Sequence, residues 1–246
     1  MNIGFECSAG SVLCMGTVST NFGTFTTQTT LSFHELYYSI TRPFFKMDNN
    51  LLITLSNIIS LIIAITIHEF AHAYSADKLG DPTPRANGRL TLNPLAHLDP
   101  LGTLMLFIAH FGWGKPVPID PYNLTKKAET IVSLAGIITN LAFAILLSLI
   151  IRLIPANIIA YQFLTSLIFI NVALAIFNLL PIPPLDGSKV FLNLLPEQLS
   201  LEWSEVFDRY GFVLLALLLF LPIGGSNLIN LVISPIIKFI CSILIY

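Results

Sequence analysis

The sequence predicts an all-α polytopic membrane protein, because the chain is apolar, poor in charge and divided into long charge-free runs. Of its 246 residues, 54% are apolar and 11% are charged, and the mean hydropathy is +0.79. Soluble domains carry about 25% charged residues, so this chain has too few to cover a globular surface. A net charge of −2 argues against a nucleic-acid partner. Three cysteines without CxxC spacing predict neither a disulfide framework nor a thiolate metal site.

The first 46 residues differ from the rest of the chain. They are rich in Ser, Thr and Phe and have neither a basic start nor a continuous apolar run, so they do not resemble a signal peptide. Met47 stands directly before the first apolar run. We therefore expect residues 1–46 to be a poorly ordered N-terminal extension or an over-long start, and residues 47–246 to form a single transmembrane domain.

Four charge-free runs after Met47 are each long enough to cross a bilayer, because about 20 apolar residues at a rise of 1.5 Å span its hydrocarbon core. These runs are 49–67, 130–151, 153–185 and 210–237. A turn of only about two to six residues is expected around Pro155. The run after Tyr210, together with the apolar tail, could cross twice, so the sequence leaves the number of crossings there open.

The end of the first run carries the pattern His-Glu-Phe-Ala-His at residues 68–72. Four residues at about 100° each bring His68 and His72 to one helix face, one turn apart, where two imidazoles can hold one metal ion. Glu69 is offset by about 100° and is placed to accept a proton from a metal-activated water. A chance match on a helix is the alternative, but ionisable groups at membrane depth are costly unless they are paired or functional.

A third ligand is needed for a zinc site with an open position for water. The run ending at residue 185 closes with Asn-Leu-Leu-Pro-Ile-Pro-Pro-Leu-Asp-Gly at residues 178–187. Its three prolines break the helix, and Gly187 permits a sharp turn directly after Asp186. Asp186 is therefore the predicted third ligand, and the alternative is a loop carboxylate or helix cap that faces water.

These two motifs resemble those of the site-2 protease family of intramembrane zinc metalloproteases. The segments Gly-Arg-Leu-Thr-Leu-Asn-Pro-Leu-Ala-His at 88–97 and Phe-Gly-Trp-Gly-Lys-Pro-Val-Pro at 111–118 are similar to those of its compact bacterial members, without a PDZ or regulatory domain. The resemblance covers about residues 51–210. It implies a site-2 protease-like transmembrane core with a small re-entrant or β element.

The resemblance also implies roles for single residues. It makes His68, His72 and Asp186 the ligands of one Zn²⁺ per chain, and Glu69 the general base. Asn178 matches an asparagine that binds the substrate backbone or polarises the scissile carbonyl, although it could equally satisfy a carbonyl of the broken helix.

Segments between the two motifs carry weaker signals. The apolar piece 101–113 is shorter than a crossing and predicts a re-entrant or interfacial segment. Val117 and Ile119 alternate with prolines, as in an edge strand. His97 is interpreted as a histidine at the polar interface. Gly136 and Asn140 lie on an apolar helix, and we interpret both as helix-packing residues.

The predicted function is hydrolysis of peptide bonds within or near transmembrane segments of membrane proteins, either in regulated intramembrane proteolysis or in clearance of remnant signal peptides. The alternative is a divalent-metal transporter or metal-binding membrane scaffold, which would not need Glu69. Expected partners are a transmembrane substrate, the lipid bilayer and a regulatory membrane partner or a second copy of the chain. Eight of the twelve Lys and Arg fall on one side of the predicted spans, which favours a multi-pass protein of the bacterial plasma membrane with its active site towards the cytoplasm.

Overall fold

The computed structural model of the chain describes residues 2–7, 14–19, 51–109, 112–153, 157–223 and 226–245. The chain divides into two compact units, Met1–Ile40 and Thr41–Tyr246. In the first unit, strand β1 (Asn2–Cys7) pairs antiparallel with strand β2 (Cys14–Ser19). The described part of the predicted extension is therefore a β-hairpin, and the predicted boundary at residue 46 stays a prediction.

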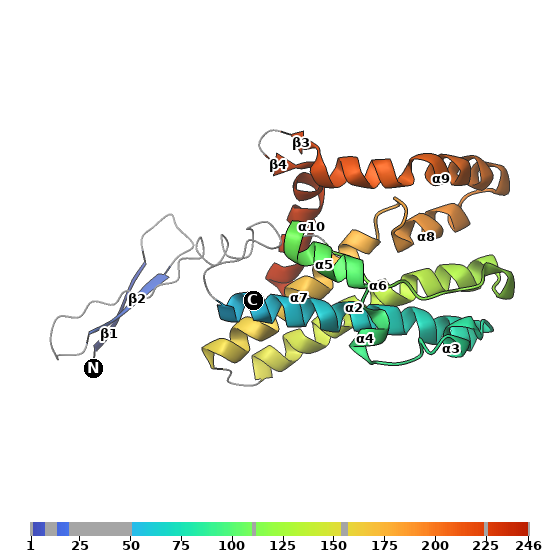
Figure 1. Cartoon of the computed structure of the whole chain (residues 1–246). Helices are drawn as coiled ribbons and strands as arrows, with labels where there is room; N and C mark the ends of the chain where they lie inside the picture. The colour runs from blue at the N-terminus through green and yellow to red at the C-terminus, as the bar shows by residue number, and fades with distance from the viewer. Residues whose placement is uncertain are drawn as a thin grey trace. The chain divides into compact units, whose positions relative to one another are not determined.

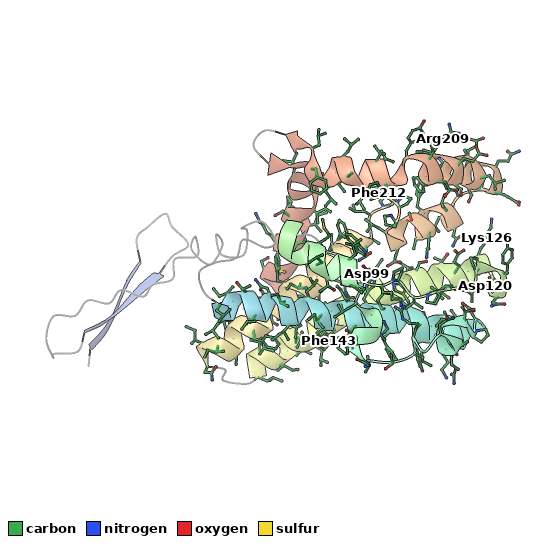
Figure 2. All side chains as sticks on the ribbon, in the orientation of Figure 1. Asp99, Asp120, Lys126, Phe143, Arg209 and Phe212 are labelled. Carbon is green, nitrogen blue, oxygen red and sulfur yellow. The ribbon has the colours of Figure 1, made fainter. Side chains whose placement is uncertain are left out.

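Three long helices form the centre of the second unit. They are α2 (Leu51–Leu79), α6 (Lys126–Leu153) and α7 (Ile158–Asn178), and among the described residues they alone are long and apolar enough to cross a membrane. This confirms three of the predicted spans. The three helices pack on one another (Figure 1). The buried core of α6 and α7 includes Ala144, Ile168 and Val172, with Phe143 packed against it (Figure 2).

The described residues between α2 and α6 form short elements: α3 (Thr83–Ala86), α4 (Pro94–His97), α5 (Pro100–Ala109) and the 3-10 helix η1 (Pro121–Asn123). Ten residues at 1.5 Å each give α5 a length of about 15 Å, half of a membrane core, as a re-entrant or interfacial segment requires. A single β-bridge joins Leu98 to Gly114.

The predicted edge strand around Val117 and Ile119 is wrong. Residues 115–120 form no strand. Prolines at 116 and 118 have no N–H to donate, and the Val117 N–H, which a ladder would need, donates instead to Glu69.

Beyond α7 the chain continues as α8 (Asp186–Leu194), α9 (Glu197–Phe220), the short hairpin β3 (Pro222–Ile223) and β4 (Ser226–Asn227), and α10 (Leu228–Ile245). The predicted charge-free run 210–237 is thus interrupted by the hairpin and does not form one span. Helix α9 begins far upstream of the run, within a charged segment, and extends its apolar half past Arg209 and Phe212 (Figure 2). Helix α10 adds Ile233 and Ile237 to the core of α6 and α7.

Candidate metal centre

His68 and His72 lie on one face of α2, as their spacing predicts. Their ring centroids are 4.6 Å apart, and the two residues are 4% and 5% exposed. Such burial inside a bundle of apolar helices requires partners for the ring nitrogens, because a buried polar group without a hydrogen bond is destabilising.

Asp186 reaches both imidazoles from the first position of α8. Its Oδ2 lies 3.0 Å from Nε2 of His68 and 3.1 Å from Nε2 of His72. The Asp186 side chain is 16% exposed, and a carboxylate oxygen this close to two imidazole nitrogens is placed to share one metal ion with them.

The turn before α8 brings this carboxylate to the histidines. The proline-rich segment after Asn178 ends α7, as predicted, and α8 begins eight residues later. A Cβ on Gly187 would overlap the backbone carbonyl of Leu179, so only glycine allows α8 to start this close to the end of α7.

The three residues fit one metal ion. One ligand atom from each of His68, His72 and Asp186 lies within 4.8 Å of the other two. Donors at about 2.0–2.1 Å from a tetrahedral zinc stand roughly 3.3 Å from one another, close to the separations found here. Two neutral nitrogens and one carboxylate oxygen, held on rigid helices, form a donor set that suits zinc.

The two histidines differ in the hydrogen-bond partner of their Nδ1 atom. Nδ1 of His72 is 2.7 Å from the backbone carbonyl oxygen of Val132 on α6. A carbonyl only accepts, so His72 donates from Nδ1 and leaves the lone pair of Nε2 for a metal. Nδ1 of His68 is buried and has no hydrogen-bond partner among the described residues.

Gly136 provides the room that the two imidazoles occupy. A Cβ at this position would lie 2.6 Å from Cε1 of His68 and 2.6 Å from Nε2 of His72. The packing role predicted for Gly136 is therefore a specific one, because this glycine lets α6 approach the histidine face of α2.

Glu69 follows His68 in the chain and is half-buried. Its Oε2 accepts a hydrogen bond from the backbone N–H of Val117 at 3.0 Å. No described residue donates to its other oxygen, Oε1.

The segment that donates to Glu69 is itself held by Arg89. This buried guanidinium donates from Nη2 to the carbonyl of Lys115 at 2.5 Å and from Nη1 to that of Pro116 at 3.2 Å. His97 is fully buried beside it and hydrogen-bonds the Thr91 carbonyl at 2.7 Å. His97 is therefore packed inside the protein, and its predicted place at the polar interface of the membrane stays a prediction.

Asn178 lies at the last position of α7, half-buried. Its Nδ2 donates to the carbonyl of Leu174 at 2.9 Å, within its own helix. This is the structural role that the sequence left open beside the catalytic one, and the catalytic role stays a prediction.

Sequence reasoning missed the supporting residues of the site. The Val132 backbone has no sequence signal, because any residue offers a carbonyl. Arg89 could have been noticed as a cation inside a proline-rich stretch, but its partners are backbone groups 26 and 27 residues away.

Together, the membrane-length helices and the convergent donors define an integral membrane protein with a buried candidate metal centre. Residues 153–220 match the model of "Peptidase family M50". Two bacterial relatives carry the name "Putative zinc metalloprotease": YwhC of Bacillus subtilis, 38% identical over 68% of this chain and 81% of its own, and Rip2 of Mycolicibacterium smegmatis, 36% identical over 65% of each.

Among solved structures, the "Site-2 Protease from Methanocaldococcus jannaschii" is 22% identical to this chain, with a TM-score of 0.49 over 86% of this chain and 83% of the other. The family assignment rests on the relative YwhC, which is 38% identical to this chain over 81% of its own length. The chain belongs to peptidase family M50, the site-2 protease family.

Proposed function

We propose that this protein is a zinc-dependent intramembrane endopeptidase that hydrolyses peptide bonds within or near transmembrane segments of other proteins. The observation that carries the proposal is the convergence of His68, His72 and Asp186 next to a carboxylate, Glu69, that is bound to none of them. A transporter or scaffold would need the three ligands but would have no use for a fixed base beside them.

His68, His72 and Asp186 would hold the zinc. When bound, zinc lowers the pKa of a coordinated water to about 7 and polarises a carbonyl. Glu69 takes a proton from the attacking water and delivers it to the leaving amide nitrogen, while the carbonyl carbon gains the water oxygen and loses that nitrogen. The bond from Val117 fixes the Glu69 carboxylate through Oε2, which leaves Oε1 to receive the proton. Asn178 is the proposed contact to the substrate backbone or the scissile carbonyl.

The substrate class is inferred from the depth of the site. His68 lies inside the apolar helix α2, so a polypeptide reaches it from the bilayer. A transmembrane helix must unwind locally before cleavage, because its carbonyls are hydrogen-bonded within the helix. Membrane-tethered regulators and remnant signal peptides meet these requirements. A regulatory membrane partner or a second copy of the chain is proposed to control access.

The orientation follows from the basic residues near the metal centre. The end of α2, the start of α6 and helix α8 carry Lys78, Lys126, Lys127 and Lys189, and Lys126 stands near Asp120 where the chain enters α6 (Figure 2). Lys and Arg accumulate on the cytoplasmic side of membrane proteins. We therefore place the active site towards the cytoplasm, in the plasma membrane of a bacterium.

Cleavage of a model transmembrane peptide by the purified protein, with zinc content measured in parallel, tests the proposal. We expect about one zinc per chain and cleavage that a chelator abolishes and added zinc restores. Glu69→Gln should keep the zinc and lose cleavage by roughly 10²–10⁴-fold. Glu202→Gln, at an exposed acid on α9, is the matched control and should cleave like the native protein.

Two outcomes would contradict the proposal. One is a native protein that binds no zinc. The other is a Glu69→Gln variant that still moves metal across vesicles while neither protein cleaves peptide, which would favour the transporter.

A further inference from the structure

Two buried polar groups near the metal centre have no hydrogen-bond partner among the described residues. One is Nδ1 of His68, and the other is the side-chain amide of Asn140 on α6, whose Oδ1 and Nδ2 are both unpaired. Asn140 is 0% exposed. An unsatisfied buried amide is destabilising by roughly 1–3 kcal/mol, so a fully orphaned one calls for a specific partner.

The packing of α2 on α6 fixes where these two groups lie. The two helices run antiparallel (Figure 1). On α6, Val132 contacts His72, and Gly136, one turn later, contacts both His72 and His68. The next position on this face is Asn140, one further turn in the direction that leads from His72 to His68.

The position of Asn140 on α6 suits a contact with His68. Nδ1 of His68 lies 2.7 Å from the Cβ position of Gly136. On a helix, Cβ atoms at i and i+4 are about 5–6 Å apart, and side chains lean towards the N-terminus, here from Asn140 towards Gly136. An amide oxygen roughly 2.4 Å from its own Cβ therefore comes within reach of His68 through one bridging water, since the two groups do not bond to each other directly in the structure.

We propose that Asn140 is a positioning residue for the metal centre, whose Oδ1 holds the Nδ1–H of His68 through one bridging water, while the Val132 carbonyl accepts the Nδ1–H of His72 directly. The proposal rests on the proposed zinc function. It gives both imidazoles an acceptor on α6 for their Nδ1–H, direct for His72 and through water for His68, with Nε2 directed at the metal. It also explains why an apolar helix carries an amide at a fully buried position.

Zinc binding tests this role separately from catalysis. Asn140→Leu keeps the size of the side chain and removes both polar atoms, and it should raise the zinc Kd, measured by chelator competition, about 10–100-fold. It should also change the absorption spectrum of the Co²⁺-substituted protein. Asn140→Asp keeps an oxygen acceptor and should retain the native affinity. Ser60→Ala removes another buried unpaired polar atom, two turns from His68 on α2, and should leave both readouts unchanged.

An Asn140→Leu variant with native zinc affinity and a native Co²⁺ spectrum would overturn the proposal. If that variant does not fold, imidazole-labelled native protein decides by NMR, since a downfield, hydrogen-bonded Nδ1 proton is expected for zinc-bound His68 and its absence would refute the role. A native protein that binds no zinc would instead refute the proposed function, so the two failures are distinguishable.

Discussion

Replacing Gly136 by alanine tests whether the close approach of α6 to the two histidines is needed for metal binding. The added Cβ would lie 2.6 Å from Nε2 of His72, where ordinary contacts begin at 3.4 Å. The imidazole must therefore retreat by about 0.8 Å, well beyond the roughly 0.2 Å over which ligand distances vary in metal sites. Overpacking of this kind costs about 1–3 kcal/mol. If this whole free-energy cost falls on metal binding, the zinc affinity becomes about 5–150-fold weaker.

Chelator competition on the purified variant measures this affinity, and the cleavage assay should show a parallel loss at limiting zinc. Alanine is the better helix former by roughly 0.5–1 kcal/mol, so α6 itself is not weakened by the exchange. Ile138→Ala, on the exposed side of α6, is the control and should bind zinc normally. A Gly136→Ala protein with native zinc affinity would refute the reasoning, because the imidazoles could then not be held where the structure has them.

Three further predictions concern the surroundings of the site. Arg89→Met should keep the zinc but lower the cleavage rate by about 10²-fold, since the Lys115–Val117 backbone that orients Glu69 loses its donors; unchanged cleavage would exclude the role. Asn178→Ala should lower the cleavage rate without changing the zinc content, because its amide is proposed to contact the substrate. A variant that cleaves as fast as the native protein would limit Asn178 to its structural bond with the Leu174 carbonyl. The pKa of Asp81 is lowered because hydrogen bonds from Thr83, Asn123 and the Asp120 N–H outweigh the opposing effect of its burial. Its contribution to stability is therefore complete above the ordinary carboxyl pKa and is lost as the pH falls through the lowered one. Asp81→Asn should reduce the free energy of unfolding by about 2–4 kcal/mol at pH 7 and flatten its acid dependence, measured by denaturation in detergent.

The sequence determined the features that depend on one segment at a time. Hydrophobic runs fixed the three long helices, because a chain in lipid must satisfy its backbone within each helix. The spacing of His68 and His72 fixed their common face through helix periodicity alone. The proline-rich segment predicted a break before Asp186, and the need of a zinc site for a third ligand singled out this carboxylate, but only the structure brings it to the histidines.

The tertiary structure decided everything that depends on two segments meeting. The antiparallel register of α2 and α6 puts Val132 and Gly136 against the imidazoles, and the fold of the 89–117 segment puts a backbone N–H on Glu69. This packing of α2 on α6 leaves no signal in the apolar sequence of α6, so Gly136 and Asn140 look like ordinary helix-packing residues in the sequence. Backbone carbonyls and missing Cβ atoms have identical chemistry at every position, and only the arrangement of helices in space makes a particular one part of the site.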